Sequence, residues 1–252
     1  MRVFALSDIH VDYRENEQWV SDLSDADFQD DTLLLAGDVS ENLRLMERCF
    51  LRLTRKFRRV VFVPGNHDLW VNRSEIPDSV SKYQRILKLA AETGIMMEPT
   101  HCEGLCIVPL LGWYDFAFGE PDAQLLSAWM DFKACAWPPD WNMKDVTEFF
   151  VNKNAITRKL NSGALITFSH FLPRIDLLPE YIPKSFRYLY PVMGSPKLEK
   201  QIRALNPQIH VYGHSHVNRQ VRLNGILYVN NAFGSPSETR TSRKDLLCIY
   251  TN

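Results

Sequence analysis

Five short polar segments of this chain contain side chains that could bind metal ions. They are Asp8-Ile9-His10, Gly37-Asp38, Gly65-Asn66-His67-Asp68, Ser169-His170 and Gly213-His214-Ser215-His216, and they contain five of the seven histidines. Carboxylates, imidazoles and an amide oxygen suit borderline or hard divalent metals, so Mn, Fe or Zn are the expected ions. No cysteine lies in these segments, so no thiolate ligand is expected.

The spacing within two of these segments favours paired ligands. Alternate side chains of an extended segment lie on one face, so Asp8 and His10 can face the same metal, as can His214 and His216. Glycines at positions 37, 65 and 213 permit tight turns next to these groups. Each segment alone is common in proteins, but the five in this order form a specific signature of one shared site.

The polar segments follow short apolar runs that are typical of buried strands. Ligands of open α/β sheets bind outside the carboxyl ends of the strands, so the five segments are expected to converge there. The expected strands are Arg2 to Leu6, Thr32 to Ala36, Arg59 to Val63, Leu105 to Leu111, Ala164 to Phe168, Gln208 to Tyr212 and Ile226 to Asn230. Val217 to Leu223 precedes the last strand across Asn224-Gly225, a dipeptide that favours an antiparallel hairpin.

Helical patterns separate several of these strands. Apolar residues recur at helical spacing in Leu43 to Phe57, which predicts an amphipathic helix on the surface. Further helices are expected at Val80 to Ala91, about Asp145 to Leu160 and about Pro196 to Leu205. Strands that alternate with helices predict an α/β fold, which we expect to be a single domain over residues 1–252.

Residues 113–152 differ in composition from the rest of the chain. They contain four of the six tryptophans and the pair Pro138-Pro139, so we interpret them as an insert or cap packed over one edge. Trp113, Tyr114 and Asp115 could offer an aromatic platform and a carboxylate to a substrate. Because buried aromatic residues mostly belong to a core, we favour packing of the insert for these side chains.

Composition and charge restrict the class of protein. The 252 residues are 45% hydrophobic and 23% charged, as in a folded globular protein, and the formal net charge is -1. A chain this close to neutrality has no global attraction for nucleic acid, so nucleic acid is not the expected partner. Five cysteines without a C-x-x-C pair, no signal-peptide pattern and no long apolar span predict a cytoplasmic protein without a membrane association.

With the blocks D-x-H, G-D, G-N-H-D, H and G-H-x-H in order from Asp8 to His216, the sequence resembles the calcineurin-like metallophosphoesterase superfamily. This resemblance implies a four-layer α/β/β/α sandwich of two facing mixed β-sheets flanked by helices, and a centre of two metal ions. It also implies the ligands: one ion is held by Asp8, His10, Asp38 and His216, and the other by Asp38, Asn66, His170 and His214. Asp38 then bridges the two ions.

The resemblance further implies a catalytic role for His67, which does not bind metal in this family. The ring of His67 would stabilise the transition state or protonate the leaving oxygen. We expect Asp68 to accept a hydrogen bond from that ring and fix its orientation, unless it only caps the preceding turn. The implied reaction is hydrolysis of a small phosphodiester or phosphomonoester by a metal-bridging hydroxide.

Two alternatives to a small-molecule hydrolase remain open. One is a protein phosphatase, although Val39-Ser40-Glu41-Asn42 stands where the Ser/Thr protein phosphatases of the superfamily carry an Asp-Arg-Gly extension. The other is a scaffold without catalytic activity that keeps the fold and binds partners through its surface. All seven implied ligands are present together with His67, which favours an enzyme. The oligomeric state cannot be predicted from these patterns.

Overall fold

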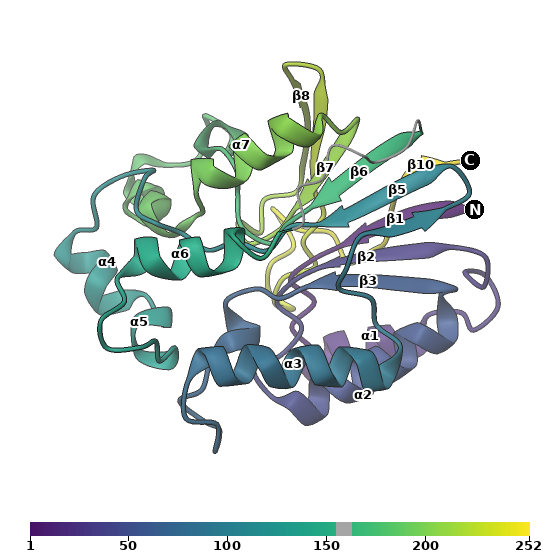
Figure 1. Cartoon of the computed structure of the whole chain (residues 1–252), viewed down its shortest axis with the longest axis horizontal. Coiled ribbons are helices and arrows are strands. Elements are labelled where there is room, and N and C mark those ends of the chain that lie inside the picture. Colours follow the sequence, from purple (N-terminus) through teal and green to yellow (C-terminus); the bar gives the residue numbers. More distant parts are fainter. Residues whose placement is uncertain (155–162) are drawn as a thin grey trace.

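The computed structural model describes residues 1–154 and 163–252, which form two β-sheets flanked by helices (Figure 1). One sheet has the strand order β10-β1-β2-β3, and the other has the order β4-β5-β6-β7-β9-β8. The strands are β1 (Arg2–Leu6), β2 (Thr32–Ala36), β3 (Arg59–Val63), β4 (Thr100–Cys102), β5 (Leu105–Pro109), β6 (Ala164–Phe168), β7 (Ile209–Tyr212), β8 (Arg219–Leu223), β9 (Ile226–Asn230) and β10 (Leu247–Thr251). Both sheets are mixed, because parallel central strands have antiparallel neighbours at their edges.

The alternation of side chains along each strand creates two apolar layers on the four-stranded sheet. In β1, Val3 and Ala5 face the other sheet, whereas Phe4 and Leu6 face the helices. The strands β2 and β3 repeat this pattern, since Leu34 and Val61 belong to the layer between the sheets. Both faces of the sheet are therefore buried, which explains why its strands read as continuous apolar runs in the sequence.

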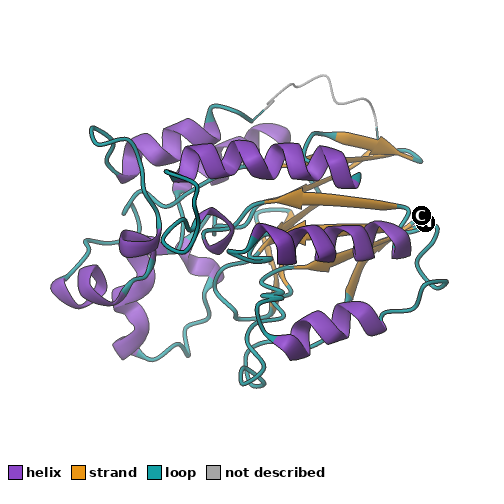
Figure 2. Cartoon of the chain, turned by 90° about the horizontal axis from the view of Figure 1, so that it is seen from below, coloured by secondary structure: helices purple, strands orange, loops and turns teal. Residues whose placement is uncertain are grey.

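Helices cover the outer faces of the two sheets, as the view from below also shows (Figures 1 and 2). The α-helices are α1 (Arg14–Asp22), α2 (Leu43–Lys56), α3 (Ser79–Thr93), α4 (Ala123–Ala128), α5 (Asp131–Ala134), α6 (Met143–Val151) and α7 (Pro196–Leu205), and the 3₁₀ helices are η1 (His67–Leu69), η2 (Ile175–Leu177) and η3 (Lys184–Val192). The helices α1, α2 and α3 lie against the four-stranded sheet, and α7 lies against the larger one (Figure 1). The predicted α/β/β/α sandwich is confirmed.

Most expected elements are found at the predicted positions, and several of them differ in length at their ends. The strand expected at Leu105 to Leu111 ends at Pro109, because the side chain of Asn154 binds the backbone of Leu111. The helix expected at about Asp145 to Leu160 begins at Met143 and ends at Val151, and its predicted continuation over 155–160 lies outside the described residues. The strand expected at Val217 begins at Arg219.

The 113–152 segment lies beyond the carboxyl ends of the strands, where α4 and α5 are seen at the left of Figure 1. The backbone carbonyl groups of Ala134 and Ala136 accept hydrogen bonds from the amides of Val71 and Ser79, which fix the segment over the turn after β3. Trp113 and Tyr114 are fully buried core residues, so the packing interpretation is confirmed for both.

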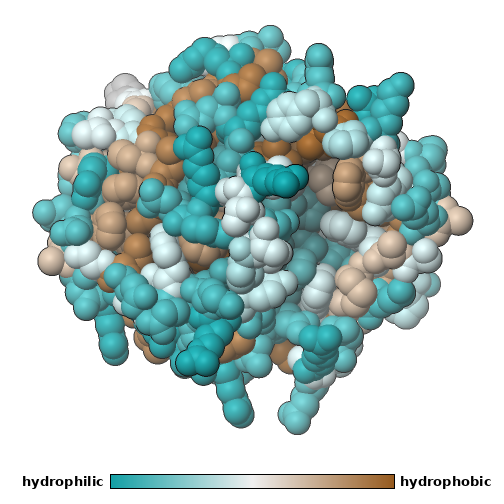
Figure 3. Space-filling model, turned by 180° about the vertical axis from the view of Figure 1, so that it is seen from behind, coloured by the Kyte–Doolittle hydropathy of each residue, from teal (hydrophilic) through white to brown (hydrophobic). Residues whose placement is uncertain are grey.

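The face of the molecule drawn in Figure 3 is mainly hydrophilic, and apolar residues gather there in separate areas. In the described part of the chain, no helix combines the length and the apolar character needed to span a membrane.

Candidate metal centre

The five polar segments identified in the sequence meet where the two sheets face each other. Three of them follow β1, β2 and β3 of the smaller sheet, and two follow β6 and β7 of the larger sheet. Six of the seven predicted ligands are buried and His216 is half-buried, and three groups of side chains around them lie close enough to hold an ion. These groups are Asp8 with His10 and His216, His10 with Asp38 and His67, and Asp38 with His170 and His214.

Asp38 lies at the centre of the cluster. Its Oδ1 accepts the backbone amide of His67 at 2.9 Å. Its Oδ2 lies 3.5 Å from Nε2 of His170 and 4.0 Å from Nε2 of both His10 and His67. One carboxylate therefore faces both halves of the cluster, as the predicted bridge requires.

Hydrogen bonds from the outer ring nitrogens fix which nitrogen of each histidine faces the cluster. Nδ1 of His170 lies 2.9 Å from the carbonyl oxygen of Ala36, and Nε2 of His214 lies 3.0 Å from that of Val192. A carbonyl only accepts, so these two nitrogens carry the protons. Nε2 of His170 and Nδ1 of His214 are then unprotonated acceptors, 3.1 Å apart.

An amide oxygen adds a third acceptor to this group. Asn66 donates its Nδ2 to a carboxylate, so its Oδ1 points inward and lies 3.1 Å from Nε2 of His170. Lone pairs at such distances repel each other unless a cation lies between them. The donor set of nitrogen and oxygen atoms therefore fits divalent metal ions.

Burial keeps most of these imidazoles neutral. It lowers the pKa of His214 to about 3 and, with the charge of His216, that of His10 to about 4. His216 differs, because the carboxylates of Asp8 and Glu238 outweigh its burial and raise its pKa. Metal binding has to displace the proton of His216, whereas His10 and His214 already present lone pairs.

The turns that carry the ligands adopt unusual backbone conformations. Nine described residues other than glycine have positive φ, and five of them are predicted ligands: Asp8, His10, Asp38, His214 and His216. Such conformations cost free energy and concentrate at functional sites. Gly37 and Gly65 also lie too close to neighbouring ligands to carry a side chain. A Cβ on Gly37 would lie 2.4 Å from Nδ1 of His170, and a Cβ on Gly65 would lie 2.2 Å from Oδ1 of Asp38.

The structure corrects the expected contact of Asp68. Its two carboxylate oxygens accept the backbone amides of Asp38, Val39, Ser40 and Gly65 at 2.8–3.0 Å. These four bonds use the lone pairs of the carboxylate, so the expected hydrogen bond from the ring of His67 is not formed. Asp68 joins the turns after β2 and β3, which matches the alternative role of a capping carboxylate.

The ring of His67 is held by an aromatic contact instead. It stacks on Trp70 with 3.8 Å between the ring centroids, and about a third of the His67 side chain remains exposed. Burial and the neighbouring histidines, His10 first among them, lower the pKa of His67. His67 thus lies beside the proposed bridging residue Asp38, and its ring is partly accessible to solvent.

Sequence reasoning missed three residues that position the cluster. Glu238 accepts Nδ1 of His216 at 2.9 Å. Asn16 of α1 donates to the carbonyl oxygens of Ile9 and Gly234, at 2.7 and 3.0 Å, and so holds the first turn. Asp131 of the 113–152 segment is buried, and its carboxylate accepts a hydrogen bond from Nδ2 of Asn66 at 2.9 Å.

Asp131 connects three parts of the site. Its Oδ1 also accepts Nε1 of Trp70, the partner of His67, at 2.7 Å, and its Oδ2 accepts Nε1 of Trp129 at 2.8 Å. We expect Asp131→Ala to weaken metal binding by about 10- to 100-fold, because Asn66 loses the contact that orients its amide. Metal titration of the stripped protein measures this change.

Asp115 offers a matched control for Asp131. It is a buried carboxylate of the same segment, and it accepts the Ser195 hydroxyl at 2.7 Å without touching a predicted ligand. Both alanine variants should lose stability, by about 1–3 kcal/mol for each buried donor left without an acceptor. Only Asp131→Ala should lose metal affinity, and equal affinities of the two variants would contradict the positioning role.

Two further polar residues lie outside the cluster. Arg174 pairs with Asp176 at 2.6 Å and Glu199 at 3.3 Å. His210 is buried between the hydroxyls of Thr167 and Ser169, which gives it a structural role.

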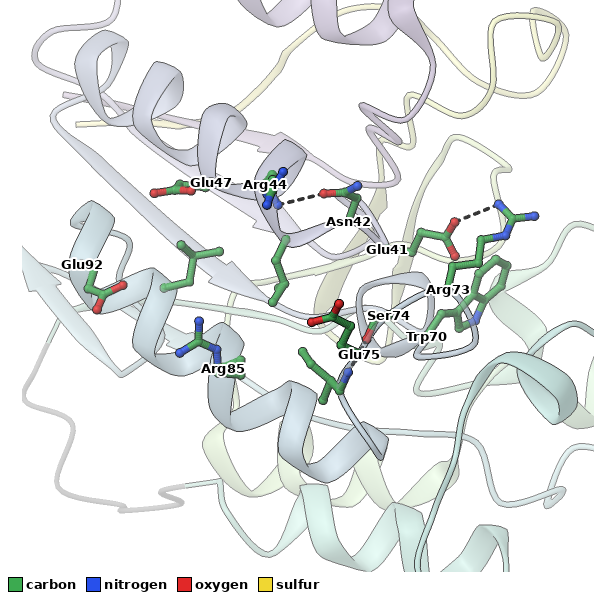
Figure 4. A pocket seen from close by; sticks show the side chains of 13 residues that line it. Glu41, Asn42, Arg44, Glu47, Trp70, Arg73, Ser74, Glu75, Arg85 and Glu92 are labelled. Carbon is green, nitrogen blue, oxygen red and sulfur yellow. Dashed lines mark hydrogen bonds and ion pairs between the residues drawn. The ribbon is translucent and has the colours of Figure 1, made fainter.

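Two adjoining cavities open on the cluster and share His67, His216 and Glu238. An apolar cleft of about 640 Å³ reaches Asp38, Asn66 and His67, and a polar cavity of about 450 Å³ reaches His10, His67 and His216. A third cavity of about 650 Å³ (Figure 4) shares Glu41, Trp70 and Arg73 with the polar one. It is lined by four glutamates and three arginines and contains none of the predicted ligands.

Comparisons with known proteins agree with the fold. The chain is 25% identical to the [acyl-carrier-protein] phosphodiesterase PptH of Mycobacterium tuberculosis, over 94% of this chain and 79% of that protein. The crystal structure of phosphopantetheinyl hydrolase from the same organism has a TM-score of 0.78 at 22% identity, over 100% of this chain and 96% of that one. The structure of TT1561 from Thermus thermophilus has a TM-score of 0.54 at 16% identity, over 92% and 89%.

The family model for calcineurin-like phosphoesterases matches residues 1–218, which include every predicted ligand. The family implies a dinuclear centre of divalent metals, and the three groups of candidate ligand atoms fit it. The chain therefore belongs to the calcineurin-like phosphoesterase family and is a metal-dependent hydrolase of phosphoesters.

Proposed function

We propose that this protein hydrolyses phosphodiesters with two divalent metal ions bound at the seven clustered side chains. Asp8, His10, Asp38 and His216 would hold one ion, and Asp38, Asn66, His170 and His214 the other. The observation that carries the proposal is the set of inward-facing acceptors, above all Nε2 of His170 and Nδ1 of His214 at 3.1 Å. When bound, two such ions supply an acidified water and positive charge at phosphorus.

The chain's own residues supply the remaining chemistry. Asp38 keeps its Oδ2 between the two halves, because Oδ1 is fixed by the amide of His67. Burial lowers the pKa of His67, so the negative charge of a bound phosphate would be needed to favour the protonated ring. The protonated ring would then donate to the leaving oxygen, as a general acid.

The donor atoms limit the candidate metals to a small group. Imidazole, carboxylate and amide ligands without thiolate accept Mn, Fe or Zn, and availability in the cell helps to decide among them. The five cysteines are free, which supports a reducing compartment and thus the cytoplasm as the proposed location. We assign the whole chain to one domain, with 113–152 as a segment that completes the site through Asp131.

A small phosphodiester is the proposed substrate class. The relative in Mycobacterium tuberculosis carries the name of a phosphodiesterase, and its structure that of a phosphopantetheinyl hydrolase. The two adjoining cavities at the cluster support a diester, because each could take one of the two ester groups. A monoester would leave one of them without an occupant.

Hydrolysis of para-nitrophenyl phosphate and bis-para-nitrophenyl phosphate tests this function. We expect metal-stripped protein to be inactive and the addition of Mn to restore turnover, with the diester hydrolysed faster than the monoester. A phosphopeptide assayed in parallel tests for a protein phosphatase. Preference for the phosphopeptide over both diester and monoester would contradict the proposed substrate class.

A further inference from the structure

We infer that the apolar cleft binds an extended, uncharged ester group of the substrate, so that the enzyme selects diesters with one such arm. This inference rests on the proposed function. The cleft begins at Asp38, Asn66 and His67, so a group esterified to a phosphate at the cluster can extend directly into it. Its volume of about 640 Å³ is within the range of small-molecule sites.

The wall of the cleft is formed largely by the 3₁₀ helix η3 and the residues before it. Side chains three positions apart lie on one face of a 3₁₀ helix, and Pro183, Phe186 and Leu189 follow this spacing and line the cleft. Tyr181 and Phe186 are the most exposed of the large hydrophobic residues, at 72% and 54%. Apolar surface gathered at the entrance of a site marks a place where a ligand packs.

The wall of the cleft away from the cluster offers no partner to an anionic arm. Among the described residues that line the cleft there is no lysine or arginine, and the carboxylate of Glu238 already pairs with His216 at 2.9 Å. A carboxylate or second phosphate that extended along this apolar wall would lose its hydration without gaining a cationic side chain. Ser215, Thr241 and Tyr190 offer hydroxyl groups, so an arm that contains amides or hydroxyls can form hydrogen bonds there.

One flat side of the cleft is held in place from within the protein. Trp129 lines the cleft, and its indole nitrogen donates to Asp131 at 2.8 Å. A fixed indole provides a rigid surface for methylene and amide groups. The carboxylate of Asp131 also accepts a hydrogen bond from Asn66, so it positions both the wall of the cleft and one of the proposed ligands.

The adjoining cavity is lined by more charged side chains than the cleft, which makes the site unsymmetrical. It contains Asp12, Tyr13, Glu41, Arg73 and Ser235 next to the cluster. A polar ester group fits this cavity and an uncharged chain fits the cleft. The geometry therefore points to a phosphodiester whose two ester groups differ.

Two para-nitrophenyl diesters that differ only in the second ester group test this inference. One carries pantetheine, a long uncharged chain with two amides, and the other carries a methyl group. We expect kcat/KM of the Mn-loaded enzyme to be higher for the pantetheine diester. The double variant Tyr181→Ala, Phe186→Ala should lower this preference by about tenfold or more, because the arm loses apolar contacts. Both side chains are exposed, so the fold should remain intact.

Leu51→Ala is the matched control, since Leu51 is exposed on α2 and lines neither the cleft nor the polar cavity. It should leave the preference unchanged, and the methyl ester should be hydrolysed equally by all three proteins. Equal kcat/KM for the two esters in the unaltered enzyme, or an unchanged preference in the double variant, would overturn the inference while the proposed function stands. Failure of the unaltered, Mn-loaded enzyme to hydrolyse either ester would overturn both.

Discussion

Asp38→Asn should abolish turnover of bis-para-nitrophenyl phosphate and reduce the bound metal at both halves of the cluster. The reason is geometric, because Oδ2 of Asp38 lies 3.5 Å from Nε2 of His170 and 4.0 Å from that of His10. An amide in this place has no negative charge to share between two cations, and its nitrogen would face unprotonated imidazoles or the ions themselves. Elemental analysis of the purified variant measures the metal content.

Folding of the Asp38→Asn variant can be followed separately from its function. The backbone of this turn is fixed by Asp68, which accepts the amides of Asp38 and Val39, so the turn should survive the substitution. We therefore expect a folded protein with little metal and no measurable rate above the uncatalysed reaction. Two metal ions per chain together with full activity in this variant would refute the ligand assignment.

His67→Ala should retain both metal ions and lose turnover. The ring is not one of the assigned ligands, and it stacks on Trp70 at the accessible side of the cluster. General acid catalysis contributes about 10²–10⁴-fold, which is the loss expected for an alkyl leaving group. A para-nitrophenolate leaving group departs at neutral pH without a proton, so its diester should show a much smaller loss.

The dependence on the leaving group separates the two roles that the family resemblance left open for His67. Equal losses for alkyl and para-nitrophenyl diesters would contradict proton donation and favour stabilisation of transition-state charge. Loss of metal would contradict both roles and place His67 among the ligands, where its ring lies within the group formed with His10 and Asp38. The three outcomes are distinguished by two rate constants and one metal analysis.

The elements that carry the ligands could be predicted from the sequence because their strands are buried on both faces. Such strands read as uninterrupted apolar runs, and the turn after each one stands out as a polar break. The short edge strands β4 and β10 lack this signal, since His101 and much of β10 are exposed to solvent. The helix α1 was missed for a similar reason, because only Asn16 and Val20 are buried in it.

The residues that orient the ligands could not be found in this way. Asp131 and Glu238 are single carboxylates, separated in sequence from Asn66 and His216, their partners in the site. No spacing rule connects such residues, and only the folded chain brings them together. Asp68 was recognised as a residue of the site, and its position after His67 suggested that the His67 ring was its hydrogen-bond partner. In the structure its carboxylate accepts hydrogen bonds from four nearby backbone amides instead.

Positive φ angles at five of the ligands were equally hidden. The glycines at 37 and 65 indicated tight turns, and both prove to lie against other parts of the cluster. The residue types of Asp8, His10 and His216 do not indicate a left-handed backbone conformation, because such residues adopt it only where the surrounding structure enforces it.

Anomalous X-ray diffraction from crystals of the Mn-loaded protein tests the dinuclear centre most directly. We expect two peaks about 3.5–4 Å apart, with Asp38 between them, His10 and His216 at one peak, and His170 and His214 at the other. A single peak, or peaks away from Asp38, would contradict it.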